Sequence, residues 1–511
     1  MKTATRLLTA FSLSILTFNM SVPTASAQIL FADYSDPDVC SGTDSDYWLT
    51  ASSFQCTPGL PILHSTDLIH WTLVNYALPR LMPYEHYDTI RHGCGVWAPS
   101  IRNHDGTYYI YYGDPDYGVY MLKTTNPAGR WEDPVLVVSG KGIIDTCPLW
   151  DDDGHVYMVN AWANSRCGFN SVLTIRQLSA DGSKSVSPPV MVYDGQPHGN
   201  HTIEGPKLYK HDGYYYILAP AGGVAGGWQL ALRSRNIYGP YNVKRVYDIP
   251  GIHQGGMVDD TFICFQERQP YGRVLHRLDI RWNDGWPMMY ERKDKPTPAP
   301  PSHPSLAYQW HANYQETFGF PTPQGMRVYS HRLADSPDYR SLWDVPNLWL
   351  KKFEGETFTD TLHATITSKS SMQQSGFVVM GRDYLRLSFR LDERYMTESP
   401  RTEEDGWFVV EECRCTDADR GGTEMVSRIG AIAAQRYDSG ATPNYACHVT
   451  FVITCARGGV CTLSYSANGD DGPFQTLASP FKAREGMWIG AKYGIYSITS
   501  ADSRGWIDLD L

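Results

Sequence analysis

The chain has 511 residues, of which 42% are apolar and 19% charged, so it can bury a large core and is not a disordered protein. Its formal net charge of −11 argues against sequence-independent binding to nucleic acid, because an acidic surface does not attract a phosphate backbone. Its 45 Gly, 33 Pro, 33 Tyr and 15 Trp residues favour turns and strands over helices.

The first 27 residues have the pattern of an export signal. Lys2 and Arg6 supply positive charge, residues 7–18 are mostly apolar, and Ala25-Ser26-Ala27 is a small-x-small cleavage pattern. We expect the mature chain to begin at Gln28 and to be periplasmic or secreted. The apolar run is short for an uncleaved anchor, the cleavage junction lacks the Cys of a lipid anchor, and no later segment is apolar for long enough to span a membrane.

The 11 cysteines do not resemble a disulfide scaffold, because they are sparse and odd in number. Cys413 and Cys415 are too close for a relaxed pair within one strand, whereas Cys447, Cys455 and Cys461 cluster and are able to pair. The sequence contains no CxxC motif, so a zinc site is not indicated. We expect mostly buried thiols, with one or two bridges.

Five aromatic β-runs, most of them after a short Asp/Gly turn, recur about every 50 residues in the first part of the chain. Each carries a hairpin signal, and a repeat of this length is typical of a four-stranded propeller blade. The sequence therefore predicts a five-bladed β-propeller, and the alternative is an irregular all-β domain with common hairpins. The marker residues of the five runs are Tyr47, Tyr108, Tyr157, Tyr215 and Phe262.

A proline-rich joint at residues 295–304 divides the chain, because such a segment holds neither a central strand nor a helix interior. Beyond it, apolar residues alternate with period two, as at Leu385, Leu387, Phe389 and Leu391. This pattern predicts a β-sandwich. We thus expect an all-β protein with a signal peptide at 1–27, a catalytic propeller at 28–300 and a sandwich at 301–511.

Three carboxylates open strand regions in apolar or Pro/Gly surroundings: Asp36, Asp145 and Glu204. A propeller gathers the inner strands of its blades around one axis, so these residues of blades one, three and four are predicted to meet there. Each by itself is more often a turn or cap residue. Together they match a glycosidase site of two carboxylates with a third group that tunes it.

The residues around these carboxylates carry a resemblance. The chain resembles glycoside hydrolase family 43 along nearly all of its mature length. Asp36-Pro37-Asp38-Val39-Cys40 is similar to the family's opening motif, Val96-Trp97-Ala98-Pro99-Ser100-Ile101 to its second-blade signature, and Thr202-Ile203-Glu204-Gly205-Pro206 to its acid-bearing motif. Gly272-Arg273-Val274-Leu275-His276 is similar to a closing segment of xylosidase-like members.

The rear part resembles the concanavalin-A-like, jelly-roll sandwich of the same enzymes. The segments that carry this likeness are Tyr308-Gln309-Trp310-His311-Ala312-Asn313, Val345-Pro346-Asn347-Leu348-Trp349-Leu350 and Gly376-Phe377-Val378-Val379-Met380-Gly381.

The resemblance implies an inverting hydrolase. Glu204 is expected to be the general acid, Asp36 the general base that activates water, and Asp145 the group that raises the pKa of the acid and orients it. Asp38 rivals Asp36 on spacing alone, and the Asp-Pro match selects Asp36. Thr146-Cys147-Pro148 departs from the Pro-Ser that often follows the family's third carboxylate.

The resemblance also suggests substrate contacts. Trp97 is expected to form an apolar wall for a sugar ring, Arg273 to reach into the pocket, and Phe54 and Trp162 to line subsites. The alternatives are a core position for Trp97 and a blade-edge ion pair for Arg273. His253 matches a family histidine that holds water or calcium near the axis. The alternative is a structural role, which is more common for a lone His. The sequence shows no acidic calcium loop. No cofactor is expected to be required, with structural calcium as the candidate ion.

The implied activity is exo-acting removal of terminal non-reducing α-L-arabinofuranosyl residues from plant hemicellulose or pectin. The alternative is a β-D-xylosidase or a bifunctional enzyme, because both sugars present similar hydroxyl patterns to a short pocket. The expected partner is a plant oligosaccharide or polysaccharide with a terminal pentose, without nucleic acid or a membrane span. Different classes also stay open: a non-catalytic carbohydrate-binding protein, and a phosphorylase-type or retaining propeller enzyme.

Overall fold

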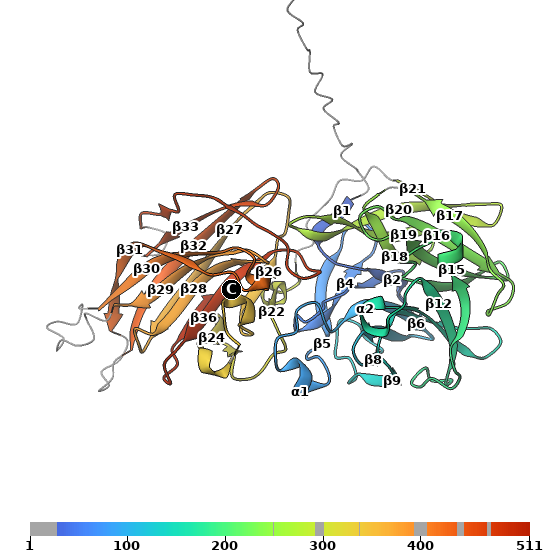
Figure 1. Cartoon of the computed structure of the whole chain (residues 1–511), viewed down its shortest axis with the longest axis horizontal. Coiled ribbons are helices and arrows are strands. Elements are labelled where there is room, and N and C mark those ends of the chain that lie inside the picture. Colours follow the sequence, from blue (N-terminus) through green and yellow to red (C-terminus); the bar gives the residue numbers. More distant parts are fainter. Residues whose placement is uncertain are drawn as a thin grey trace, which may run out of the picture.

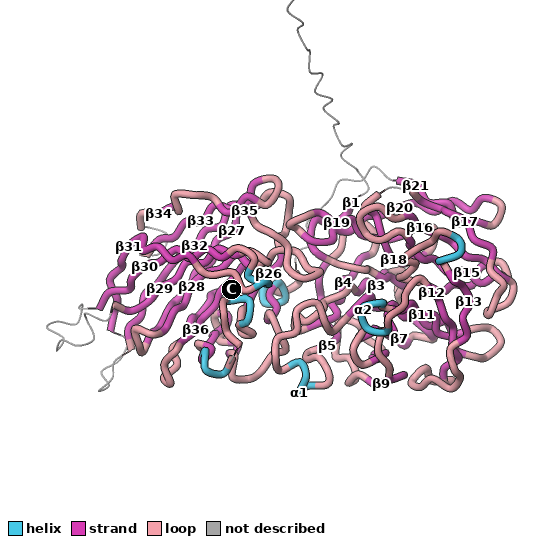
Figure 2. The backbone as a smooth tube through the Cα atoms, viewed as in Figure 1, coloured by secondary structure: helices cyan, strands magenta, loops and turns pink. Residues whose placement is uncertain are grey.

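The computed structural model describes residues 28–248, 250–291, 301–336, 338–392, 406–436, 444–467 and 472–511. The export signal and residues 295–300 of the proline-rich joint lie outside these ranges. Two all-β halves lie side by side, the blue-to-green half made by the first part of the chain and the orange-to-red half by the second (Figure 1). Strands dominate both halves, and the helices are short (Figure 2).

The first half is a five-bladed β-propeller, as predicted. Each marker aromatic lies on the second strand of its blade, because its Asp/Gly turn joins that strand to the innermost one. The first four blades are β2 (Asp38–Ser41), β3 (Tyr47–Thr50), β4 (Gly59–Ser65) and β5 (Thr72–Leu78); β6 (Trp97–His104), β7 (Thr107–Asp114), β8 (Gly118–Thr124) and β9 (Val135–Ser139); β10 (Ile143–Trp150), β11 (Val156–Trp162), β12 (Val172–Leu178) and β13 (Val190–Asp194); and β14 (Lys207–His211), β15 (Tyr214–Ala221), β16 (Trp228–Ser234) and β17 (Asn242–Tyr247).

The fifth blade closes the ring with the N-terminal strand. It contains β18 (Ile252–Val258), β19 (Thr261–Arg268), β20 (Gly272–Asn283) and β21 (Trp286–Glu291). The first part of β20 also pairs with β1 (Gln28–Asp33), which joins the start of the mature chain to the last blade. Two four-residue helices, α1 (Tyr84–Tyr87) and α2 (Asn164–Cys167), lie in the loops.

The inner strands share a local distortion at the level of the predicted site. Asp36, Ala98, Asp145 and Gln254 all have positive φ, between 35° and 58°, and Gly205 has φ 58°. The pairing of β6, β10 and β18 shifts register at this point. A bulge of this kind re-aims a side chain. Non-glycine residues are strained in this region, so the fold holds the four non-glycine positions in an unusual geometry.

The second half is a β-sandwich whose two layers join through β31. The predicted alternation at Leu385–Leu391 falls on β29, where all four apolar side chains are buried. One layer contains β22 (Tyr308–Trp310), β25 (His331–Arg332), β26 (Trp349–Lys352), β36 (Lys492–Thr499), β28 (Gln373–Met380), β29 (Tyr384–Leu391), β30 (Gly406–Cys415) and β31 (Met425–Arg436); the other contains β32 (Tyr445–Ala456), β27 (Phe358–Ser368), β37 (Trp506–Asp510), β24 (Gly325–Tyr329), β23 (Gly319–Pro321), β33 (Val460–Ser466), β34 (Gln475–Thr476) and β35 (Phe481–Lys482).

The two halves are joined by backbone and side-chain hydrogen bonds. Thr57 and Trp310 form a β-bridge, and the amide of Leu81 donates to the buried Asn313 Oδ1 at 2.7 Å. His92 stacks on Trp343, with ring centroids 3.8 Å apart. These contacts fix the sandwich against the propeller beside the pocket described below.

The expectation of one or two disulfide bridges is wrong for this structure, in which all eleven cysteines are free thiols. Most of them are buried, where a thiol packs as a small apolar side chain. Cys455 and Cys461 lie opposite each other on β32 and β33, as their closeness in sequence suggested. In the part of the chain that the structure describes, no helix has the length and apolar character needed to cross a bilayer.

Candidate active site

The three predicted carboxylates line one cavity of about 560 Å³, at the end of the propeller axis where the inner strands begin. Asp36 precedes β2, Asp145 lies at the start of β10, and Glu204 precedes β14. Residues more than 160 positions apart in the sequence thus share one pocket, because the blades converge on the axis.

Asp36 is held by two donors in the wall of this cavity. Its side chain is buried, and Ser52 Oγ donates to its Oδ2 at 2.7 Å. Nη1 of Arg273 donates to the same carboxylate, 3.2 Å from Oδ1 and 3.3 Å from Oδ2. Ser52 Oγ itself accepts the amide N–H of Ala98 at 2.8 Å, so its orientation is fixed. These contacts orient a carboxylate toward the cavity, as a general base requires.

Asp145 and Glu204 are coupled through the backbone and by charge. The amide of Gly205, the residue after Glu204, donates to Asp145 Oδ2 at 2.7 Å. Burial, together with the charges of Glu204 and Asp36, raises the pKa of Asp145 to about 8. Two neighbouring carboxyls in a buried site do not both ionise readily, so the pair retains a proton through neutral pH. A general acid needs such a proton.

His253 lies directly beside the predicted acid. Its Nε2 is 3.1 Å from Glu204 Oε1, and its Nδ1 has no hydrogen-bond partner among the described residues. That pattern fits one ordered water more closely than calcium, which prefers several oxygen ligands. The described ranges contain no group of three His, Cys, Asp or Glu side chains placed to hold a metal ion.

All four predicted substrate-contact residues line the cavity: Phe54, Trp97, Trp162 and Arg273. Trp97 is half-buried, and its indole N–H donates to Gly93 O at 2.8 Å, which fixes the ring. It also packs against propeller core residues, so the pocket-wall and core interpretations both apply. The ion pair of Arg273 is with Asp36 in the cavity, rather than at a blade edge.

The sandwich supplies a wall residue that the sequence analysis missed. Trp488, which is 49% exposed, lines the same cavity, and the Cζ atom of Arg273 lies 5.7 Å from its ring centroid. Gln254 and Glu267 of the fifth blade also line the cavity. Gln254 directly follows the predicted site residue His253, and this adjacency was a signal available in the sequence. In the structure Gln254 occupies the strained position of β18. No local signal in the sequence indicates Trp488, because its position in the cavity wall depends on how the sandwich docks on the propeller.

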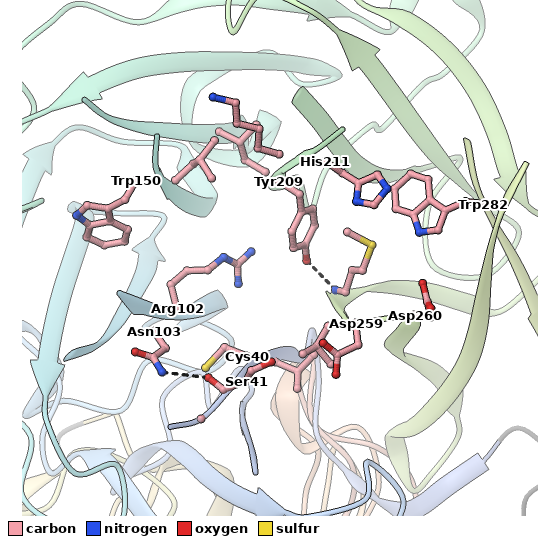
Figure 3. A pocket seen from close by; sticks show the side chains of 17 residues that line it. Cys40, Ser41, Arg102, Asn103, Trp150, Tyr209, His211, Asp259, Asp260 and Trp282 are labelled. Carbon is pink, nitrogen blue, oxygen red and sulfur yellow. Dashed lines mark hydrogen bonds between the residues drawn. The ribbon is translucent and has the colours of Figure 1, made fainter. Parts of the chain in front are cut away.

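The opposite mouth of the axis is also hollow, with a volume of about 730 Å³. Figure 3 shows this second hollow, where Arg102 points inward and Trp150, His211 and Trp282 lie around it. Arg102 is engaged there by Asp38, whose Oδ2 it contacts at 2.6 Å. Asp36, Asp145 and Glu204 are not among the lining residues of this larger hollow. The smaller cavity, which holds all three, is therefore the candidate active site.

Two family models match the chain, one for each half. Residues 27–287 match the model of glycosyl hydrolases family 43, and residues 301–511 match the beta xylosidase C-terminal concanavalin A-like domain. The chain belongs to glycosyl hydrolases family 43. The matched ranges include all three carboxylates of the candidate site in the first and Trp488 in the second.

Several curated relatives of this family 43 chain are glycosidases by name. It is 36% identical over 271 residues to a putative beta-xylosidase of Xylanibacter ruminicola, a match covering 51% of this chain and 50% of the relative. It is 32% identical over 280 residues to a non-reducing end alpha-L-arabinofuranosidase of Bacteroides ovatus, covering 49% and 51% respectively. The chain thus spans about half the length of these relatives. A beta-xylosidase of Formosa agariphila is matched at 23% identity over 94% of this chain and 88% of its own length.

Solved structures share the two-part fold of this family 43 protein. The xylan beta-1,4-xylosidase of Bacillus halodurans superposes with a TM-score of 0.72 at 19% identity, covering 94% of this chain and 99% of that chain. An engineered family 43 enzyme described as both an endo-xylanase and an exo-arabinofuranosidase gives a TM-score of 0.74 at 20% identity, with the same coverage. At these identities the likeness concerns the fold alone.

Proposed function

We propose that this protein is an exo-acting, inverting glycosidase that removes single terminal pentoses, with β-D-xylosyl residues as its main substrate. The observation that carries the proposal is the convergence of Asp36, Asp145 and Glu204 on one cavity walled by Trp97 and Trp488. A carboxylate held by its own donors, Asp36, and a neighbouring pair of carboxyls that retains a proton, Asp145 and Glu204, suit base and acid catalysis at one glycosidic bond.

In this mechanism Glu204 donates its proton to the glycosidic oxygen as the bond to the anomeric carbon breaks. Asp36 accepts a proton from water, and that water attacks the anomeric carbon from the opposite face. Arg273 and Ser52 keep Asp36 aimed at the water. Asp145 helps the pair to keep a proton for Glu204 to donate, because two neighbouring carboxyls in a buried site do not both carry a negative charge readily. The site returns to its starting form when Asp36 releases its proton to solvent and Glu204 regains one from solvent.

We propose xylose rather than arabinose as the main sugar released because of the names of the relatives. The sandwich matches a domain named after beta xylosidase, and the Xylanibacter and Formosa relatives are both named as beta-xylosidases. The arabinofuranose preference of the sequence analysis stays a prediction. It is retained as the second candidate because the Bacteroides ovatus relative is named as an arabinofuranosidase.

Side-by-side assays test this proposal. The purified protein is incubated with 4-nitrophenyl β-D-xylopyranoside, 4-nitrophenyl α-L-arabinofuranoside and xylotriose. We expect the highest kcat/KM on the xyloside, and xylose with xylobiose as the first products of xylotriose. Asp36→Asn is the matched control for contaminating activity. Turnover of neither glycoside, with retained binding of xylo-oligosaccharides, would support the carbohydrate-binding alternative instead.

Two further expectations belong to the same proposal. The protein is proposed to be exported to the periplasm or beyond, on the strength of its N-terminal pattern, and N-terminal sequencing of the mature protein is expected to begin at Gln28.

We also propose that catalysis requires no metal. Dialysis against a chelator is expected to leave kcat/KM unchanged, and restoration of lost activity by calcium would contradict this.

A further inference from the structure

One buried carboxylate joins the two halves of the molecule directly behind the cavity. Asp33 is the last residue of β1, and its Oδ1 accepts the amide N–H of Arg273 at 2.8 Å. Its Oδ2 accepts the amide N–H of Gly490, in the sandwich, at 2.9 Å. The same side chain thus holds the backbone of the arginine that contacts Asp36 and the backbone of a sandwich loop.

The sandwich holds Asp33 from a second direction. Lys352 of β26 donates from Nζ to the backbone carbonyl of Asp33 at 2.6 Å, and the ammonium lies 3.8 Å from the ring centroid of Tyr34. Burial lowers the pKa of Lys352 to about 8, so at neutral pH this is a charged donor inside the interface. A charge-assisted hydrogen bond in such a place is strong and directional.

The two chain segments touch through glycines. A Cβ atom on Gly272 would lie 2.4 Å from Asp33 Oδ1 and 2.7 Å from the nitrogen of Gly490. A Cβ atom on Gly490 would lie 2.4 Å from the carbonyl oxygen of Tyr271. The amide of Ala491 also donates to Pro270 O at 2.8 Å. The backbones are therefore in direct contact, and a shift of one segment moves the other.

The sandwich loop held in this way presents Trp488 to the cavity. The loop is a tight turn, in which the amide of Gly486 donates to Ile489 O at 2.9 Å. Trp488 has φ 63°, in the left-handed region that a bulky residue rarely adopts. Strained conformations of this kind persist only when their surroundings hold them. The bond from Gly490 to Asp33 is an anchor of this turn on the propeller.

We propose that Asp33 is a positioning residue that sets Arg273 and Trp488 in register with each other across the domain interface. It is not among the residues that line the cavity, and it acts through the backbone amides of Arg273 and Gly490, which donate to it. The proposal rests on the proposed function, because it assumes that Arg273 and Trp488 surround a bound sugar. In this proposal the sandwich contributes Trp488 to the site, and Asp33 of the propeller holds the sandwich loop that carries it.

Asp33→Asn is the direct test. The carboxamide keeps the shape of the side chain but turns one acceptor into an NH₂ group, so either the Arg273 or the Gly490 amide loses its partner. We expect kcat/KM on 4-nitrophenyl β-D-xylopyranoside to fall about tenfold, the order of effect of one orphaned buried donor. Hydrogen exchange followed by mass spectrometry is expected to speed up in peptides that contain residues 486–491, whether or not the protein turns over the substrate.

The matched control is Asn313→Ala. Asn313 is also a buried interface residue, with two hydrogen bonds to Leu81, and it contacts neither Arg273 nor Gly490. We expect this variant to lower Tm while its kcat/KM stays near the wild-type value. Equal losses of kcat/KM in Asp33→Asn and Asn313→Ala would reduce Asp33 to an ordinary interface contact.

A double-mutant cycle with Trp488→Phe shows whether Asp33 acts through the loop. We expect Asp33→Asn to cost less in the Trp488→Phe background than in the wild type, because the two residues act as one unit. Should Asp33→Asn fail to fold, Asp33→Glu keeps both acceptors but displaces them by one methylene, and is expected to give the same coupling. Additive effects together with unchanged exchange at 486–491 would overturn the proposal. A wild type inactive on both glycosides would instead count against the proposed function, and the exchange measurement would still test the anchor.

Discussion

The amide of Gly205 donates a 2.7 Å hydrogen bond to Asp145 Oδ2, which ties the residue after Glu204 to the carboxyl of the preceding blade. This bond holds two carboxyl-bearing residues from different blades in one arrangement. Burial and neighbouring charge raise the pKa of Asp145 to about 8, so the pair keeps one proton at neutral pH. Acid catalysis depends on that proton, and the pair therefore determines the pH range of activity.

Asp145→Asn is expected to narrow that range from the alkaline side. In the wild type, kcat/KM should be sustained below about pH 8 and fall as the pH rises through that value, because the pair then loses its proton. A neutral side chain at 145 removes the repulsion that retains the proton, so the alkaline limb should move to lower pH. The measurement is the pH profile of kcat/KM for both proteins on the nitrophenyl xyloside. An unmoved limb would exclude Asp145 from control of the acid.

The acid and the base should respond differently to the leaving group. Glu204→Gln is expected to lower kcat by about 10²–10⁴-fold on xylobiose, and by much less on a nitrophenyl xyloside that needs little protonation. Asp36→Asn should be inactive on both, because water activation is still missing. Parallel kinetics of the two variants on the two substrates provide the test. Rescue of Asp36→Asn by the nitrophenol leaving group would assign Asp36 another role.

Much of the propeller was predictable because its signals are local. An Asp/Gly turn followed by aromatic alternation needs only a few residues, and the five markers Tyr47, Tyr108, Tyr157, Tyr215 and Phe262 all lie on the second strands of their blades. The three carboxylates were predictable for a related reason. Each sits where an inner strand begins, and the propeller places those starts together on the axis.

Features that depend on contacts between distant segments were not predictable. β1 pairs with β20, more than 240 residues later, and an apolar run at the start of the mature chain does not indicate that partner. Trp488 and Asp33 reach the site only because the sandwich docks on the propeller in one particular way. The expected disulfides are wrong for a different reason. Cys455 and Cys461 do face each other, as their closeness in sequence suggested, yet both are free thiols, because neither Cys count nor proximity fixes whether a bond forms.

Acid should destabilise the propeller through His276. This residue on β20 is fully buried, and neither ring nitrogen has a hydrogen-bond partner among the described residues. Burial and the charge of Arg268 lower its pKa to about 3. In the unfolded chain this imidazole binds a proton near pH 6.5, whereas in the folded chain it binds one only near pH 3. The free energy of unfolding is therefore highest above pH 6.5 and decreases as the pH falls below that value.

The size of this effect is measurable by urea denaturation. Between pH 6.5 and pH 4, the free energy of unfolding should fall by about 3 kcal/mol from this residue. His276→Leu, which cannot titrate, should show a smaller decrease over the same interval. Parallel curves for the two proteins would mean that His276 acquires a proton or a partner in the folded state.

Removal of the sandwich should damage the site as well as the stability. A propeller ending at Pro300 lacks Trp488 from the cavity wall and leaves Asp33 Oδ2 without the amide of Gly490. It also exposes interface residues that are buried in the whole chain. We expect insoluble protein, or soluble protein with markedly lower kcat/KM, as measured on the purified fragment and the full chain. Full activity of the fragment would show that the sandwich is dispensable.

The stereochemistry of the first product tests the central claim most directly. If Asp36 activates water and forms no bond to the sugar, 4-nitrophenyl β-D-xylopyranoside is hydrolysed with inversion. Proton NMR recorded in the first minutes, before mutarotation, should then show α-xylose ahead of β-xylose. Release of β-xylose first, or a xylosyl ester on Asp36 detected by mass spectrometry, would contradict the account and assign the enzyme a retaining mechanism.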